Sequence, residues 1–255
     1  MEMLNYADQK ELFATVKALG IKPHIIAETG SKAWGTDIAT SDHDLTVIAD
    51  DVNYDVYSYP RTAFTAKIQF KGQDVDVRMY SIERFLRKVL KTNLSAYEVV
   101  HTQWHMGPEY LHKLLADSLD YFYDPREMFR SCRGNIAEIR DKGWKGRRQM
   151  FRYSFMCLQL IDGITTGNKP VMSVQNYLDK HDGAMFNNKN LVSKLHAWAM
   201  SEYTTEKQDA EWELVMRGIR SYDFPASVDF KQGAERDYMN SVFAKFRAHV
   251  DAKQG

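Results

Sequence analysis

The chain has little cysteine and no long hydrophobic run, and both shortages exclude classes of protein. Its 255 residues include only two cysteines, Cys132 and Cys157, which form no CxxC pair. Neither a disulfide framework nor a cysteine-rich zinc site is therefore indicated. No apolar run approaches the roughly 20 residues of a membrane-spanning helix. The first residues, MEMLNYADQKELF, contain no apolar signal-peptide core. We therefore expect a cytoplasmic protein with no membrane partner.

An excess of charge of one sign is also missing. The 34 Lys and Arg residues balance the 34 Asp and Glu residues, which argues against a strongly basic surface for nucleic acids. The common glycine-rich nucleotide motifs are absent as well. GSKAWGTD, residues 30–37, lacks the Lys-Ser/Thr of a Walker A loop, and no G-x-G-x-x-G occurs. The pattern therefore excludes a P-loop NTPase and a dinucleotide-binding Rossmann domain.

The hydrophobic pattern divides the chain into a mixed first part and a helical remainder. Strands are predicted at 23–27, 44–49, 64–70 and 73–80, and the last two form a hairpin. Beyond residue 82 the spacing of apolar residues is almost wholly helical. We predict an α+β fold, with a mixed β-sheet and helices over residues 1–115. An all-helical C-terminal domain over residues 116–255 follows it.

Pairs of aspartates, two residues apart, accompany two of the predicted strands. Asp42 and Asp44 lie at the start of one strand, and Asp74 and Asp76 alternate with valines in another. Because residues i and i+2 share one face of a strand, neighbouring strands would gather these carboxylates into a cluster. Close like charges repel unless a cation compensates. Hard oxygen ligands suit Mg²⁺ or Mn²⁺ rather than zinc, so we expect such an ion there.

A Gly-Ser turn, Gly30-Ser31, precedes the first aspartate pair. Glycine allows backbone N–H groups to approach a phosphate closely. Residues 31–34 are predicted to open a short helix, whose N-terminus favours anions. The order of these features along the chain predicts a phosphate-binding loop beside the carboxylates.

Two histidines, His101 and His105, are four residues apart, which is the spacing of one helical face. The glutamate of the H-E-x-x-H motif is missing between them, so a zinc hydrolase is not indicated. We interpret them as a structural pair in the core or on the surface rather than as a metal site.

With these motifs, the sequence resembles the DNA polymerase β nucleotidyltransferase superfamily. The resemblance rests on Gly30-Ser31, on Asp42 and Asp44, and on Asp76 between two valines. Asp74 competes with Asp76 for the role of third carboxylate, and Asp76 fits better because apolar residues flank it on both sides.

A narrower resemblance links the chain to the predicted nucleotidyltransferases of the RNA repair pathway DNA polymerase β type. It rests on ETGSKAWG at residues 28–35, SDHDL at 41–45 and RFLRKVLKTNLSAYE at 84–98. Lys145-x-x-x-Gln149-x-x-Arg152 also parallels that group's Lys-x-x-x-His-x-x-Arg motif, with glutamine in place of the histidine.

The resemblance implies an enzyme that moves a nucleoside monophosphate from a nucleoside triphosphate to a hydroxyl group with the help of Mg²⁺ or Mn²⁺. Asp42, Asp44 and Asp76 would be catalytic and would hold the metal, and the helical domain would close the cleft. The residues implied to bind the nucleotide are Gly30, Ser31, Lys32, Lys145, Arg148 and Arg152. The acceptor stays open, with an RNA end, a small molecule and a protein side chain as candidates.

Two other functions stay open at this stage. One is a nucleotide- or nucleic-acid-binding module that has lost turnover. The other is a toxin–antitoxin component that modifies a partner protein by nucleotidyl transfer. The presence of all three expected carboxylates favours an active enzyme over the first of these.

Overall fold

The computed structural model describes residues 6–38, 41–50, 64–139, 143–180, 188–225, 238, 240–245 and 248. The chain forms two compact units. The first comprises Met1–Ala33, Ala39–Tyr123 and Asp229–Gly255, and the second comprises Trp34–Ile38 and Asp124–Val228. The first unit thus extends through Tyr123 before the chain enters the second, and the short early segment Trp34–Ile38 belongs to the second unit.

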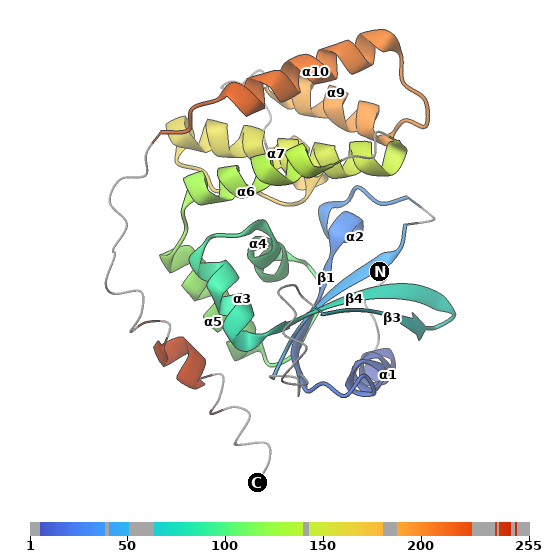
Figure 1. The fold of residues 1–255 in the computed structure, drawn as a ribbon, viewed down its shortest axis with the longest axis vertical. Coiled ribbons are helices and arrows are strands. Elements are labelled where there is room, and N and C mark those ends of the chain that lie inside the picture. Colours follow the sequence, from blue (N-terminus) through green and yellow to red (C-terminus); the bar gives the residue numbers. More distant parts are fainter. Residues whose placement is uncertain are drawn as a thin grey trace. The chain divides into compact units, whose positions relative to one another are not determined.

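A five-stranded mixed sheet forms the centre of the first unit (Figure 1). Its strands are β1 (Pro23–Thr29), β2 (His43–Ala49), β3 (Phe64–Phe70), β4 (Gln73–Ser81) and β5 (His105–Met106). The order across the sheet is β3-β4-β2-β1-β5. Only β2 and β4 run parallel among these neighbours, and the other pairs are antiparallel. The α+β fold with a mixed sheet, which the sequence predicts, is therefore confirmed.

One face of this sheet is apolar and packs against α1 (Tyr6–Lys17). Alternate residues of β2 and β4 point into this core, together with Leu12 and Val16 of the helix. The strand residues that do so are Leu45, Val47, Ala49, Val75, Val77 and Met79. The aspartates occupy the intervening positions and therefore lie on the opposite face.

Three further helices, α3 (Ile82–Leu90), α4 (Leu94–His101) and α5 (Glu109–Tyr121), also belong to the first unit. Ser81 is the N-cap of α3, and its hydroxyl accepts a hydrogen bond from the backbone N–H of Arg84. Asn93 caps α4 in the same way through Ser95. Such caps stabilise a helix start by about 1 kcal/mol each.

The second unit is helical in its described residues. Its helices are α6 (Pro125–Glu138), α7 (Trp144–Thr166), α8 (Val174–Lys180), α9 (Asn188–Met200) and α10 (Glu206–Ser221). The long helix α7 packs against α6, α9 and α10. Trp34, from the short early segment, is fully buried and meets Phe155 of α7 edge to face. Within the described ranges, no helix combines the length and the hydropathy that a bilayer span requires.

Two adjacent residues of α1 provide a matched test of this core. Leu12 is 1% exposed and lies in the core, whereas Phe13 is 36% exposed. We expect Leu12→Ala to lower the free energy of unfolding by about 2–5 kcal/mol, because it leaves a cavity against the sheet. Phe13→Ala should cost less than about 1 kcal/mol. Urea denaturation measures both, and equal losses would contradict the packing described.

Candidate functional site

The sheet brings two of the predicted aspartates side by side. Asp44 of β2 and Asp76 of β4 are register partners on parallel strands, so about 4.8 Å separates their backbones. Thr29 of β1 lies opposite Asp44 on its other side. These three residues form a row across one face of the sheet, and on β3 Lys67 extends the row beyond Asp76.

The Gly-Ser turn packs directly on one of these carboxylates. Gly30 has a φ of +71°, and a Cβ atom added to it would lie 2.7 Å from Cγ of Asp44. Only glycine fits here without displacing the aspartate. Any other residue is strained at this φ and carries a Cβ atom that collides with Asp44. The backbone of the predicted phosphate-binding loop and the Asp44 carboxylate are therefore in contact.

The other predicted residues of the loop lie close by in the chain. Gly30 begins the five-residue helix α2 (Gly30–Trp34), which also carries Ser31 and Lys32. Both side chains are partly exposed. Asp42 lies one residue before β2, outside the helices and strands. The short helix predicted after the turn is therefore confirmed.

The two candidates for the third carboxylate differ in their surroundings. Asp76 faces Asp44 across the parallel pair, and its carboxylate lies 3.5 Å from Nζ of Lys67. Asp74 lies at an exposed position nearer the hairpin turn and accepts a hydrogen bond from the side-chain amide of Gln69. Both belong to the same face of β4, and the register favours Asp76 as the partner of Asp44.

Asp44 and Asp76 share one face of the sheet, but the three predicted carboxylates do not form a closed cage. In the part of the chain that the structure describes, the carboxylate oxygens of Asp42, Asp44 and Asp76 do not all lie within 4.8 Å of one another. The ion pair with Lys67 draws the Asp76 carboxylate toward β3. This pair is exposed, so it contributes little stability, and a divalent cation of higher charge could compete with it for the carboxylate.

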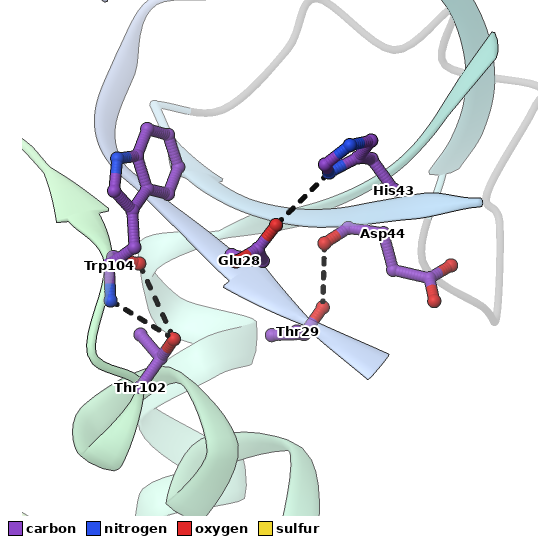
Figure 2. Close-up of polar contacts among 6 residues, drawn as sticks. All are labelled: Glu28, Thr29, His43, Asp44, Thr102 and Trp104. Carbon is purple, nitrogen blue, oxygen red and sulfur yellow. Dashed lines mark hydrogen bonds and ion pairs between the residues drawn. The ribbon is translucent and has the colours of Figure 1, made fainter. Parts of the chain in front are cut away.

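A nearly buried histidine–glutamate pair, which the sequence does not reveal, lies on the face of β2 opposite to Asp44. Nδ1 of His43 is 3.1 Å from Oε1 of Glu28, and both side chains are nearly buried (Figure 2). Thr29 also donates a hydrogen bond to the backbone carbonyl of Asp44. Because His43 lies between Asp42 and Asp44, these contacts tie the aspartate-bearing backbone to the end of β1.

Two cations that the sequence pattern does not single out lie beyond Asp76 on the same side. Arg78 lies two residues after Asp76 on β4, and Tyr80 lies two residues after Arg78. Nζ of Lys88, on α3, lies 5.0 Å from the centre of the Tyr80 ring and 3.4 Å from Oδ1 of Asn93. Burial lowers the pKa of Lys88, and the positive charges of Arg78 and Arg84 lower it further. A polyanion at this place would reduce the repulsion between the cations.

The remaining predicted basic residues belong to the second unit and share one face at the start of α7. Arg148 is buried, donates to the backbone carbonyl of Thr36 and stacks on Trp144, 4.0 Å from the ring centre. Burial lowers the pKa of Arg148, as does the neighbouring Arg152. Nε of Arg152 is buried and has no hydrogen-bond partner among the described residues. Lys145 lies near the Trp144 ring.

The close packing of Gly30 provides a sharp test of the site, with Gly35 as a matched control. Both have positive φ, +71° and +65°, but nothing lies within 4 Å of a Cβ atom added to Gly35. Both Ala variants should therefore lose about 1–2 kcal/mol of stability through strain. Only Gly30→Ala should displace Asp44 and weaken Mn²⁺ binding, by at least about tenfold. Electron paramagnetic resonance of free Mn²⁺ measures this, and equal affinities in the two variants would contradict the contact.

Comparisons with known proteins place few constraints on the chain. No protein-family model matches it, and no curated protein matches it. One similar solved structure is that of a nucleotidyltransferase-like protein from Exiguobacterium sibiricum. It is 12% identical over 97% of this chain and 92% of the other, with a TM-score of 0.36. A TM-score this low does not establish a shared fold, so the functional inference depends on the residues of the site.

Proposed function

We propose that this protein is a nucleotidyltransferase that moves a nucleoside monophosphate from a nucleoside triphosphate to a hydroxyl acceptor. One observation carries the proposal. The Asp44 carboxylate touches the glycine of the Gly-Ser turn and lies in register with Asp76 on the neighbouring parallel strand. This arrangement supports the proposal, because a backbone that would bind phosphate lies next to two carboxylates that would bind a metal.

The donor set fits Mg²⁺ or Mn²⁺. Asp42, Asp44 and Asp76 offer only carboxylate oxygens, and such hard ligands favour these ions. The backbone at Gly30, where a Cβ atom would collide with Asp44, brings the turn directly against this carboxylate. When bound there, the metal would neutralise charge on the triphosphate and on the departing pyrophosphate.

The chain's own groups would then orient the reaction. The backbone N–H groups of the turn and the hydroxyl of Ser31 would bind the terminal phosphates, with Lys32 beside them. The acceptor oxygen would attack the α-phosphorus, and the bond from that phosphorus to the β-phosphate oxygen would break, releasing pyrophosphate. The acceptor proton would pass to a carboxylate, for which Asp76 is the candidate, and from there to solvent.

Positive side chains would hold the remaining phosphates. Arg78 and Lys88 lie on the aspartate side of the first unit, and the half-buried setting of Lys88 strengthens its attraction for anions. In the second unit, Lys145, Arg148 and Arg152 are further candidates. Arg148 already supports Thr36 and Trp144, so we expect Arg152 to be the more available phosphate ligand.

The acceptor can be identified by following a label. The protein is incubated with each α-labelled NTP, Mg²⁺ or Mn²⁺, and RNA, DNA or total cell protein. We expect label on RNA ends, consistent with the narrower family resemblance. Label on a protein would instead indicate a protein-modifying enzyme. ATP binding without pyrophosphate release on any acceptor would indicate a binding module and would contradict the proposed activity.

The two candidates for the third carboxylate can be separated by mutation. We expect Asp76→Asn to reduce kcat by at least about 100-fold, comparable to the loss of a main electrostatic catalytic group. Asp74→Asn, on the same strand face, should reduce it less than about fivefold, because Asp74 has no register contact with Asp44. Asp42→Asn combined with Asp44→Asn should abolish transfer. Rates of pyrophosphate release measure these effects, and full turnover by the double variant would remove the mechanism.

Lys88 offers a second test, with a neighbour on the same helix as its control. Lys88→Met should weaken ATP binding by about 10–100-fold, since a half-buried charged contact is worth about 1.5–3 kcal/mol. Arg87, which is exposed and pairs with Glu83, should tolerate the same change to Met with little effect. Isothermal titration calorimetry with Mg²⁺ present compares them. Unchanged ATP affinity in the Lys88 variant would remove this residue from the nucleotide site.

A further inference from the structure

A second group of metal-binding side chains lies away from the aspartates, where β5 turns into α5. His105, Glu109 and His112 each offer a ligand atom, and these atoms all lie within 4.8 Å of one another. Nε2 of His105 is 3.2 Å from Oε2 of Glu109. The two imidazole rings are stacked with their centres 3.7 Å apart and an angle of 4° between their planes.

The backbone holds the first histidine in place. His105 pairs with Ala27 of β1 at the edge of the sheet. Gly107 follows with a φ of +134°, and a Cβ atom there would collide with the carbonyl oxygen of His24. Pro108 then leads into α5. The turn is therefore packed directly against β1, which fixes the direction in which α5 leaves the sheet.

The helix supplies the other two side chains. Glu109 and His112 are three residues apart on α5 and so share one face of it. This face is the one directed at His105, since both residues contact that histidine. A tight turn and one helical turn thus bring together three ligands that are spread over eight residues of sequence.

The hydrogen bond of His112 determines which of its nitrogens can bind a metal. Nε2 lies 3.3 Å from the backbone carbonyl oxygen of Val99. A carbonyl only accepts, so Nε2 must carry the proton, and in the neutral ring Nδ1 bears the lone pair. A metal-binding histidine commonly donates its other N–H to a carbonyl or carboxylate in this way, which fixes the ring and its tautomer.

We propose that His105, Glu109 and His112 bind a Zn²⁺ ion at a site separate from that of the nucleotide. Two imidazoles and one carboxylate are a donor set that zinc uses when it keeps a position open to water. The Glu109 side chain is 82% exposed, so the ion would reach the site from solvent. Nitrogen ligands distinguish this site from the all-oxygen aspartate site.

The stacked rings must rearrange when the ion binds. The lone pairs of two parallel rings lie in parallel planes and cannot both point at one ion. His105, which lacks the carbonyl contact of His112, is the ring expected to rotate about its Cβ–Cγ bond. Metal binding would therefore break the ring stack and connect the edge strand β5 to α5.

A titration with Co²⁺, which reports its coordination through visible absorption, tests the site in the full chain. Asp44→Asn and Asp76→Asn are introduced first, so that the aspartate site does not contribute. We expect one equivalent of Co²⁺ to bind with the absorption of a nitrogen-ligated ion, and Zn²⁺ to displace it. Absence of nitrogen-ligated binding would overturn the proposal, whatever the outcome for nucleotidyl transfer.

Two histidine variants make the assignment specific. In the same background, His112→Ala should weaken Zn²⁺ binding by at least about tenfold. His101→Ala is the matched control, because His101 lies at the end of α4 and its ring packs on Tyr97. The Zn²⁺ affinity of this variant should be unchanged. Circular dichroism verifies that both variants fold. The assignment is wrong if His112→Ala binds Zn²⁺ as tightly as the parent does. It is also wrong if His101→Ala loses as much Zn²⁺ affinity as His112→Ala. Rotation of His105 is followed separately by NMR of the ring nitrogens.

Discussion

The parallel register of β2 and β4 is the constraint on which the candidate site depends. It places Asp44 beside Asp76 on one face of the sheet, where two negative side chains on neighbouring strands repel each other. The core on the other face enforces this arrangement, because Leu45 lies opposite Val77. A slip of one residue would bury a carboxylate and expose a valine. Hydrophobic packing on one face of the sheet thus holds two carboxylates near each other on the opposite face, and a bound cation would reduce their repulsion.

Local alternation was enough to predict much of this geometry. The strand positions at 64–70 and 73–80, the hairpin between them, and the shared face of Asp74 and Asp76 all follow from period-two patterning. Sequence periodicity does not, however, indicate which strands become neighbours, and the parallel pairing appears only in the structure. The contact between Glu28 and His43 escaped prediction for the same reason, since it joins two strands whose adjacency no local signal reveals.

The two histidines of HTQWH show where helical spacing misleads. Their separation of four residues predicts one helical face, but α4 ends at His101 and the backbone is extended at Thr102. His105 instead joins β5, a strand of two residues that is too short for any alternation to be visible. His105 therefore does not share a helical face with His101, and the ring that it meets is that of His112. Tertiary pairing with β1 overrides the local spacing.

Residues 34–38 have a consequence for how the protein can be dissected. The chain leaves the sheet unit after Ala33, contributes a buried tryptophan to the helical unit, and returns at Ala39. A fragment cut at Tyr123 would keep Trp34 but lose Phe155, its partner, so a large apolar side chain would become exposed to water. The complementary fragment would have a hole in its core. Gene fragments that divide this chain at a single point should therefore give poorly soluble products, whereas co-expressed halves could restore the missing packing.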